Sequence, residues 1–566
     1  MKIINFKSLY FFFNLLILSI CLLIVGSCKE RRHGFIIKAY TDIHKRIVAS
    51  NDKNNIFIAD NASDFYSVMW YQTGNLSDSK LNSKNIAIDP NSNIFPKSVS
   101  FDNELLCLEK LDSNHTQLQL VLYSLKNSNY IDITFNEPST KKGGAFSPSK
   151  SLFAFICDGA LVLYNYRQKT YSNPIFPDGK LFIYLTWSTN GKFILLLDES
   201  RGVWRMNLEQ NLIEKKLKIP GNNELNTIQI TPIKETENDF LFISDAGTKN
   251  GFNQVFHYSE ISGTKQLTFT DYDKALFERP TSIVNIEYRQ NVEGYWQIGG
   301  KNKHDLSNRI LKGVIYDYVE NANNTIYVLH SSNDRPIQLT KISKTSLTEI
   351  HNPNQDYFKI KGPEIIRNKF GMYHLVFTAS KNENKWILWL HGGPHEQVSI
   401  RYNHFFSTLL NNGYNIIALN YPGSTGIGNK YELINISEED LIETQIKSIL
   451  EDIKLIKNKS RIKCKLNLIS ISYGSILAHE LSKSAPEEFL KLIDISGIHS
   501  DKTNSKIEKL FIYGDKDFIL KNNNRKAFLN QFSLPKSTVI LKSEGHYILK
   551  RTSFDIMLRS ILSFLK

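Results

Sequence analysis

The amino-terminal half of the chain carries a repeat that limits the possible folds more than any other feature does. From about residue 35 to residue 350, short β-type runs alternate with polar, turn-rich stretches. Four segments share one plan, in which a short β-type run leads through a polar turn into a strongly apolar strand. The four are SVSFDNELLCL at 98–108, GAFSPSKSLFAFI at 144–156, LTWSTNGKFILLL at 185–197 and IQITPIKETENDFLFI at 228–243.

The spacing of these segments identifies the repeat unit. Equivalent positions are occupied by Ser100, Ser147, Ser188 and Thr231, which stand 47, 41 and 43 residues apart. That is the period of a four-stranded propeller blade. The next strand pair recurs as well, in GALVLYNYRQKTY, RGVWRMNLEQNLI and NQVFHYSEISGTKQLTF. The sequence therefore predicts a β-propeller of about seven blades over 35–355. Six or eight blades are alternatives, and an array of β-sandwiches is the competing architecture.

Beyond residue 360 the pattern changes to apolar strands that alternate with helices. KWILWL, YNIIALNYPG, KLNLISIS, FLKLIDISG, EKLFIYGD and STVILKSEG read as strands. A helix with one apolar face is predicted between the second and third of them, because isoleucines recur at spacings of four and three, at Ile442, Ile446, Ile449, Ile453 and Ile456. This alternation predicts a mostly parallel sheet with helices on both faces over 356–566. Ligands of such sheets bind beyond the carboxyl ends of the strands.

Three side chains at the ends of successive predicted strands form a candidate catalytic triad. Ser472 stands in SISYGS between a strand and a helix start, as in a nucleophile elbow. Asp517 ends YGDKD after a later strand, and His546 lies in SEGHY after the next one. Serine, then acid, then histidine is the order found in α/β-hydrolases. A serine hydroxyl needs a base to remove its proton, so His546 would be that base and Asp517 would orient it.

The motif HGGP, at 391–394, supplies a candidate oxyanion hole. Glycines let the backbone approach a substrate carbonyl, so the N–H groups of Gly393 and Tyr473 are the expected donors. Taken alone, HGGP would also fit a tight turn. His391 and His395 flank the glycines, but no further ligand set accompanies them. Neither a metal site nor an organic cofactor is therefore predicted.

Together these motifs resemble the prolyl oligopeptidase family of serine peptidases, and within it the acylaminoacyl-peptidase-like and dipeptidyl-peptidase-like bacterial branches. HGGPH, NYPGSTGIG at 420–428, SISYGS, YGDKD and EGHY occur in the family's order within 360–566. GTKQLT and NDRPIQLT in the repeat region are weaker matches. The resemblance implies a propeller followed by an α/β-hydrolase domain, with the triad and oxyanion donors named above. It also implies that the propeller restricts entry to short peptides.

The sequence departs from the family pattern in three places. Ser470 stands where the family's GxSxG begins with glycine, and Pro422 stands where NYPGSTG usually has arginine. Asp517 follows Ser472 by only 45 residues, and DKTNSKIE takes the place of a longer insert that lines the specificity pocket in relatives. Substrate specificity therefore does not carry over from the resemblance. A less enclosed site would also lose positioning and water exclusion.

The amino terminus has the pattern of an export signal. Lys2 and Lys7 precede an apolar run that ends in VGSC, which resembles a bacterial lipobox. We predict a signal peptide over 1–27 and lipid attachment at Cys28. The rest of the chain would then be an exported lipoprotein, tethered at the periplasmic or cell-surface face of a membrane. The alternative is an uncleaved membrane anchor.

Composition and the cysteine count argue against a nucleic-acid partner, a disulfide framework and a metal site. Hydrophobic residues make up 41% of the chain and charged residues 22%, as in ordinary globular proteins. The net charge of +13 comes from scattered lysines rather than from basic runs with interleaved aromatics, so no nucleic-acid partner is expected. Cys107, Cys157 and Cys464 are odd in number and widely spaced, which fits buried apolar residues rather than disulfides or a metal site.

Three functions remain open at the level of sequence. The first is a membrane-tethered serine peptidase that hydrolyses short peptides through an acyl-enzyme. The second is an esterase, because the same triad and oxyanion hole serve esters. The third is a catalytically degenerate propeller–hydrolase that binds a partner; the shortened segment supports it and the complete triad speaks against it. The propeller favours the peptidase, since esterases on this scaffold usually lack one.

Overall fold

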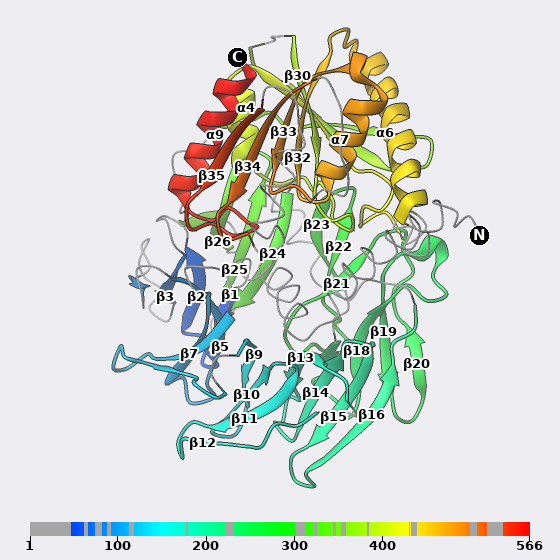
Figure 1. Ribbon diagram of the computed structural model, residues 1–566. Helices are drawn as coiled ribbons and strands as arrows, with labels where there is room; N and C mark the ends of the chain where they lie inside the picture. Colours follow the sequence, from blue (N-terminus) through cyan, green and yellow to red (C-terminus); the bar gives the residue numbers. More distant parts are fainter. Residues whose placement is uncertain are drawn as a thin grey trace, which may run out of the picture.

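The computed structural model describes most of the chain from residue 47 onward. The described residues are 47–60, 66–73, 82–87, 92–111, 118–136, 139–176, 179–221, 230–300, 313–321, 325–342, 347–352, 358–381, 384–428, 431, 438–498, 507–517 and 536–566. The predicted signal peptide and Cys28 lie outside them. Within these ranges, no helix is long and apolar enough to cross a membrane. The described strands form seven small antiparallel sheets and one sheet of eight strands (Figure 1).

Each small sheet is one blade of a propeller, and its strands follow one another in chain order. Blade one contains β1 (Ile47–Ala49), β2 (Asn55–Asp60), β3 (Ser67–Gln72) and β4 (Asn82–Ile86). Blade two contains β5 (Asn93–Val99), β6 (Leu105–Leu111), β7 (Leu118–Ser124) and β8 (Tyr130–Asp132). Blade three contains β9 (Lys141–Phe146), β10 (Leu152–Cys157), β11 (Ala160–Asn165) and β12 (Thr170–Tyr171). Blade four contains β13 (Phe182–Trp187), β14 (Phe193–Asp198), β15 (Gly202–Asn207) and β16 (Leu212–Lys218).

The other three blades complete the ring. Blade five contains β17 (Ile230–Pro232), β18 (Phe240–Ser244), the short helix η1 (Lys249–Gly251), β19 (Gln254–Ser259) and β20 (Gly263–Gln266). Blade six has three strands in the described part of the chain, β21 (Lys274–Leu276), β22 (Tyr288–Val292) and β23 (Tyr295–Gly299). Blade seven contains β24 (Gly313–Glu320), β25 (Ile326–Ser332), β26 (Arg335–Ile342) and β27 (Leu347–His351). The prediction of about seven blades is confirmed.

The repeated serines mark the turn between the first and second strands of successive blades. The N–H of Ser100 donates to the carbonyl of Leu105 at 2.9 Å, and Ser188 donates to Phe193 at the same distance. The hydroxyls of the two serines accept the amides of these partners, at 2.9 and 3.0 Å. A short hydroxyl side chain therefore closes each turn. Ser50 makes the same pair of contacts in blade one, a repeat position that the sequence analysis missed.

The propeller closes by side-chain packing between its first and last blades, whose described strands belong to separate sheets. All strands of blade one precede those of blade two in the chain, and all strands of blade seven follow those of blade six. Ile56, Ile58 and Tyr71 of blade one pack with Tyr327 and Leu339 of blade seven. All five side chains are buried. We call this contact the closing seam, since the ring depends on it.

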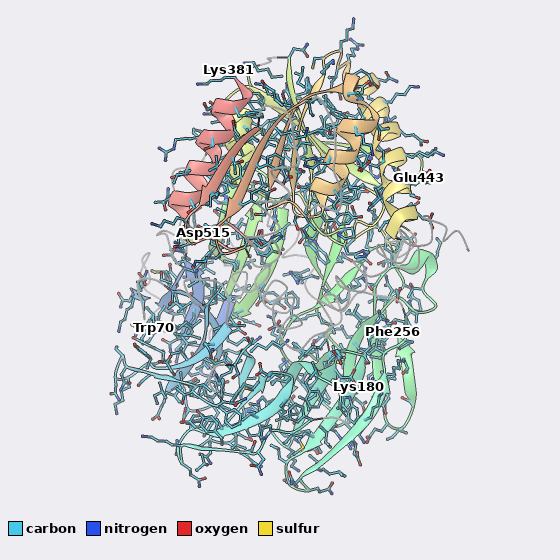
Figure 2. All side chains as sticks on the ribbon, in the orientation of Figure 1. Trp70, Lys180, Phe256, Lys381, Glu443 and Asp515 are labelled. Carbon is cyan, nitrogen blue, oxygen red and sulfur yellow. The ribbon has the colours of Figure 1, made fainter. Side chains whose placement is uncertain are left out.

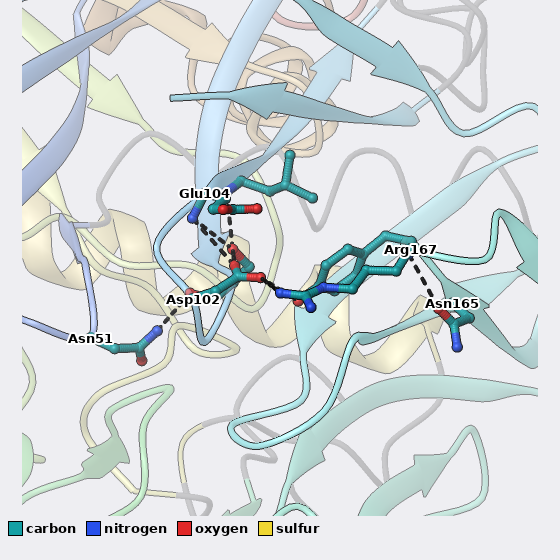
Figure 3. Close-up of polar contacts among 8 residues, drawn as sticks. Asn51, Asp102, Glu104, Asn165 and Arg167 are labelled. Carbon is teal, nitrogen blue, oxygen red and sulfur yellow. Dashed lines mark hydrogen bonds and ion pairs between the residues drawn. The ribbon is translucent and has the colours of Figure 1, made fainter. Parts of the chain in front are cut away.

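Polar contacts join blades one, two and three at a single turn (Figure 3). Asp102 of blade two accepts hydrogen bonds from the hydroxyl of Ser100 at 2.5 Å and from Arg167 of blade three at 3.1 Å. Asn51 of blade one donates to the carbonyl of Ser100 at 2.7 Å. Burial alone would raise the pKa of Asp102, but the hydrogen bonds from Ser100 and Arg167 bring it below its usual value. This turn therefore helps to fix three consecutive blades relative to one another.

The eight-stranded sheet and its helices form a second domain, which we call the α/β domain. The strand order is β28 (Glu364–Arg367), β29 (Tyr373–Phe377), β31 (Tyr414–Leu419), β30 (Lys385–Leu390), β32 (Leu466–Ile471), β33 (Phe489–Ile495), β34 (Glu508–Gly514) and β35 (Lys536–Leu541). From β31 to β35 all neighbours are parallel, whereas β28 and β29 pair in the antiparallel sense. The prediction of a mostly parallel sheet is confirmed.

Helices cover both faces of this sheet (Figure 1). α4 (His404–Asn411) and α9 (Arg551–Leu565) pack on one face, and α6 (Glu438–Ser460) and α7 (Gly474–Ser484) pack on the other. The predicted isoleucine stripe lies on α6 and faces the sheet. Its later residues, Ile449, Ile453 and Ile456, are buried, and the two earlier ones are partly buried against the same core.

The carboxyl ends of strands β32 to β35 face the propeller. Asp515, directly after β34, lies where the α/β domain meets the propeller (Figure 2). Beyond β35, Tyr547 and Leu549 pack against an apolar cluster of blade two that contains Phe95 and Leu118. The side chains that follow these strands are therefore placed between the two domains.

A second set of contacts joins blades six and seven to the segment after β30. Nδ2 of Asn291 donates to Oε1 of Gln397 at 2.7 Å. The N–H of Ile400 donates to the carbonyl of Gly294 at 2.9 Å. In blade seven, the hydroxyl of Ser331 accepts the amide of Tyr402 at 3.1 Å. The two domains are therefore held together on two sides by different kinds of contact.

We expect Ile56→Ala to lower the free energy of unfolding of the propeller by about 2 to 4 kcal/mol, because it removes a buried side chain from the closing seam. Ile261→Ala is the matched control: Ile261 is 98% exposed, and its loss should change stability by less than about 0.5 kcal/mol. Urea unfolding of the two variants and the wild type measures both values. If Ile56→Ala were as stable as Ile261→Ala, the seam would not hold the ring closed.

Candidate active site

Ser472 occupies a tight turn between a strand and a helix. It follows β32 directly, and its φ of +52° lies in the left-handed region, which residues other than glycine rarely adopt. The N–H of Ser472 donates to the carbonyl of Ile495 at 3.0 Å, and the N–H of Ser475 donates to the carbonyl of Ser472 at 3.0 Å. The side chain of Ser472 is partly exposed. This arrangement is that of a nucleophile elbow.

His546 lies between Ser472 and Asp517. Its Nε2 is 2.9 Å from the hydroxyl oxygen of Ser472, and its Nδ1 is 3.0 Å from Oδ2 of Asp517. His546 and Asp517 are both buried, at 5% and 4% exposure. When Nδ1 carries the proton and donates it to the carboxylate, Nε2 is free to accept the proton of the serine. The structure therefore brings together all three residues of the predicted triad.

Two loops must approach each other closely to place the acid beside the histidine. A Cβ on Gly514 would lie 2.2 Å from the carbonyl oxygen of Glu544, so only glycine fits at the end of β34. The carboxylate of Glu544 accepts the amides of Leu549 and Lys550, at 3.0 Å each. It thereby closes the loop that carries His546 onto the start of α9. Burial raises the pKa of Glu544.

The glycine loop that carries one of the predicted oxyanion donors lies beside the serine, and the other donor belongs to the next residue, Tyr473. A Cβ on Gly392 would lie only 3.3 Å from Cβ of Ser472, so the glycine loop passes very close to the nucleophile. Gly393 has a φ of +125°, which side chains rarely tolerate. Tyr473 is the N-cap residue of α7, where the first amides have no acceptor within the helix. Backbone N–H groups at these two positions suit an oxyanion formed at Ser472.

His391 holds the glycine loop in place. Its Nδ1 is 2.6 Å from the carbonyl oxygen of Gly392, and its Nε2 is 2.9 Å from the hydroxyl oxygen of Ser424. The ring also stacks on Tyr421, with ring centroids 4.3 Å apart. Burial lowers the pKa of His391 to about 4, so the ring is neutral at neutral pH. The histidine next to the glycines is therefore part of the oxyanion-loop structure.

The remaining histidine and cysteine candidates, His395 and the three cysteines, contact neighbouring parts of the fold. Nδ1 of His395 lies 3.0 Å from the carbonyl oxygen of Gly423. Cys107 and Cys157 form no disulfide and lie in an apolar core of the propeller, where Sγ of Cys157 is 3.2 Å from the hydroxyl oxygen of Ser139, and Cys464 is partly exposed. Within the described ranges, no group of three or more histidine, cysteine, aspartate or glutamate side chains could hold a metal ion.

Ser470, which replaces the first glycine of GxSxG, belongs to a buried polar network beneath the elbow. Its hydroxyl oxygen lies 3.1 Å from that of Ser475, on the other side of the turn. Ser475 donates to Oδ1 of Asp494 at 3.0 Å, and Nε2 of His479 lies 3.0 Å from Oδ2. All four side chains are buried. Sequence reasoning missed Asp494 and His479, because no motif links them to the serine.

In the described part of the segment between Ser472 and Asp517, the elements are α7, the single turn η2 (Pro486–Glu488), β33 and β34. β33 and β34 are parallel neighbours, and residues 496–507 connect them. Most of the sequence that replaces the longer insert of relatives, 499–506, lies outside the described residues.

Comparison with known sequences finds one short similarity. No known family's sequence model matches the chain. Acylamino-acid-releasing enzyme 1 of Oryza sativa subsp. japonica is 29% identical to it over 121 residues. These residues are 21% of this chain and 15% of the rice enzyme, so the match spans only a small part of that relative's length.

Solved structures resemble the chain over nearly its whole length. The Pyrococcus horikoshii acylaminoacyl peptidase is 13% identical, with a TM-score of 0.66 over 92% of this chain and 94% of that one. A prolyl endopeptidase is 11% identical, with a TM-score of 0.70 over 94% of this chain and 91% of that one. At such identities the likeness establishes the fold, a β-propeller joined to an α/β-hydrolase domain. The predicted fold class is confirmed.

We expect the free energy of unfolding to fall as the pH drops from about 6.5 to about 4, in part because of His391. Its pKa of about 4 in the folded protein lies below the ordinary 6.5, so the unfolded chain binds more protons in this window. The contribution is fully present above pH 6.5, and roughly 3 kcal/mol of it is lost by pH 4. His330 of blade seven, whose burial also lowers its pKa to about 4, adds a similar loss.

Urea unfolding of the wild type and of His391→Asn at a series of pH values measures this effect. The variant keeps His330 and should therefore show a shallower pH dependence than the wild type, without losing it entirely. An unchanged pH dependence in the variant would contradict a buried, neutral His391.

Proposed function

We propose that this chain is a member of the prolyl oligopeptidase family and acts as a serine peptidase on short peptides. The observation that carries the proposal is the hydrogen-bonded series of Ser472, His546 and Asp517 at strand ends that face the propeller. The fold shared with an acylaminoacyl peptidase and a prolyl endopeptidase supports it.

The proposed reaction proceeds through an acyl-enzyme. The hydroxyl oxygen of Ser472 attacks the scissile carbonyl carbon while Nε2 of His546 takes its proton. The backbone N–H groups of Gly393 and Tyr473 donate to the oxyanion of the tetrahedral intermediate. His546 then protonates the leaving amine, and the acyl-enzyme forms. Water attacks the ester carbonyl in the same way and restores Ser472, with Asp517 stabilising the imidazolium in both halves.

The position of the propeller favours short substrates. The loop that carries His546 continues into Tyr547 and Leu549, which pack against blade two. On another side, the segment after the oxyanion loop is bonded to blade six through Asn291 and Gln397. A substrate has to reach Ser472 between these contacts, so extended peptides fit better than folded proteins.

A fluorophosphonate probe, which reacts only with an activated serine, tests the proposal. We expect the wild type to be labelled, and Ser472→Ala and His546→Ala to lose labelling by more than about a thousandfold. Ser496→Ala is the matched control. Ser496 is a buried serine that follows the neighbouring strand β33, and its hydroxyl makes no hydrogen bond with the described residues. This variant should be labelled like the wild type.

A panel of chromogenic peptides and simple p-nitrophenyl esters then separates the peptidase from the esterase. Peptides should be cleaved with a higher kcat/KM than p-nitrophenyl esters of short acyl groups that carry no peptide chain. Ester hydrolysis without peptide hydrolysis would support the esterase. A folded wild type that is not labelled would overturn both, and would leave a binding role for the propeller.

We further propose that the enzyme acts outside the cytoplasm as a lipoprotein attached through Cys28. The lipobox-like VGSC and the preceding apolar run support this proposal. We expect full-length protein to be recovered with membranes and to incorporate radiolabelled palmitate. Cys28→Ser should lose the label, because it removes the thiol that is lipidated. Label that persisted in Cys28→Ser would contradict lipidation at this residue.

A further inference from the structure

Gln445 is a buried polar side chain on the apolar face of α6. It is 0% exposed, and Ile449, one turn further along the same face, is part of the apolar core. Burying an amide costs free energy unless its donor and acceptor are both paired. Here both are paired, and neither partner belongs to α6. The role of Gln445 therefore follows from the two parts of the fold that its hydrogen bonds connect.

The first contact is with the residue that follows the nucleophile. The hydroxyl of Tyr473 donates to Oε1 of Gln445 at 2.8 Å. Both side chains lie in the core between α6, α7 and the sheet. The backbone N–H of Tyr473 is one of the two oxyanion donors proposed above. Gln445 thus fixes the far end of the side chain whose backbone holds this donor.

The second contact is with the loop that supports the other donor. Nε2 of Gln445 donates to the carbonyl of Pro422 at 2.6 Å. A Cβ on Gly423 would lie 3.0 Å from this nitrogen, so the amide packs directly against the loop. Two residues after Pro422, Ser424 lies 2.9 Å from Nε2 of His391. His391 in turn holds the glycine loop, as described above.

The orientation of the amide follows from its partners. A backbone carbonyl can only accept, so the NH₂ end of Gln445 must face Pro422, and the oxygen then faces the hydroxyl of Tyr473. Proline at position 422, where the family pattern has arginine, leaves this contact intact. The contact uses only the backbone carbonyl oxygen, which proline keeps although it lacks an N–H.

We propose that Gln445 is a positioning residue that keeps the N–H groups of Gly393 and Tyr473 aligned on one oxyanion. The inference rests on the proposed peptidase function and names a residue that controls its rate. Gln445 acts through Tyr473 on one side and through the Pro422 loop on the other. Its effect should appear in the transition state, where the oxyanion is fully formed, and not in binding of the ground state.

Gln445→Met removes both hydrogen bonds at nearly constant volume. We expect kcat for a good peptide substrate to fall about 10- to 100-fold, with KM changed less than twofold, because the donors are misaligned but still present. Ile449→Ala is the matched control for packing of α6. It should lower the Tm without changing kcat, because its apolar side chain makes neither of the two hydrogen bonds that Gln445 makes.

Gln445→Glu gives a readout that a packing role would not produce. The ionised carboxylate would place an acceptor against the carbonyl of Pro422, and only the protonated acid can donate there. The ratio of the variant's kcat to that of the wild type should therefore rise as the pH falls. A purely structural role would give the same ratio at every pH.

Tyr473→Phe tests the hydrogen bond between Tyr473 and Gln445 by changing the other residue of the pair. It removes the hydroxyl but keeps the backbone N–H, and combining it with Gln445→Met should cost less than the product of the two single losses. A wild-type kcat in Gln445→Met, or a pH-independent ratio in Gln445→Glu, would overturn the inference and leave the proposed function intact. A wild type that neither reacts with the probe nor cleaves peptides would overturn the proposed function itself, and with it the inference.

Discussion

The left-handed turn at Ser472 is the constraint on which the active site depends. A non-glycine residue in this conformation costs about 1 to 3 kcal/mol, so the surroundings have to hold it there. A Cβ on Gly474 would lie 2.4 Å from the carbonyl oxygen of His391, which presses the start of α7 against the oxyanion loop. Below the turn, Ser470 and Ser475 bond to each other across it. The elbow is thus held on one side by the close backbone contact with the oxyanion loop, and on the other side by the buried hydrogen bond between Ser470 and Ser475.

The parts of the site that sequence could predict are those carried by short motifs at strand ends. Ser472 and His546 each follow a recognisable apolar strand, and their order along the chain is that of the fold. Gln445 could not be predicted in this way, because its partners Tyr473 and Pro422 are distant in the chain and meet it only in the fold. The sequence of its helix shows only an amphipathic pattern. Glu544 was within reach, since it belongs to the quoted EGHY, but its role depends on the amides of Leu549 and Lys550, just before α9. The number of blades could be predicted only as a range, because the repeated segments were recognised in four blades, two to five, and the other blades were inferred from the length of the region.

The propeller supports the active site as well as covering it. The loop with His546, the proposed base, continues into Tyr547, which packs on blade two. The segment after the glycine loop is bonded to blade six through Ile400 and Gly294. The proposed base and the glycine loop are therefore supported by different blades. A shift of the blades relative to one another would therefore move both the loop with His546 and the glycine loop. Changes at the closing seam between blades one and seven should thus affect activity as well as stability.

The three departures from the family pattern differ in kind, and the structure separates them. The hydroxyl of Ser470 bonds to that of buried Ser475. The carbonyl oxygen of Pro422 accepts a hydrogen bond from buried Gln445. Neither weakens the elbow or the oxyanion loop. The short segment before Asp517 is different in position, because it lies in the chain between β33 and β34, whereas Ser472 follows β32 and Asp517 follows β34. In the proposed peptidase, we therefore expect the shortening to alter the choice of substrate more than the chemistry at Ser472.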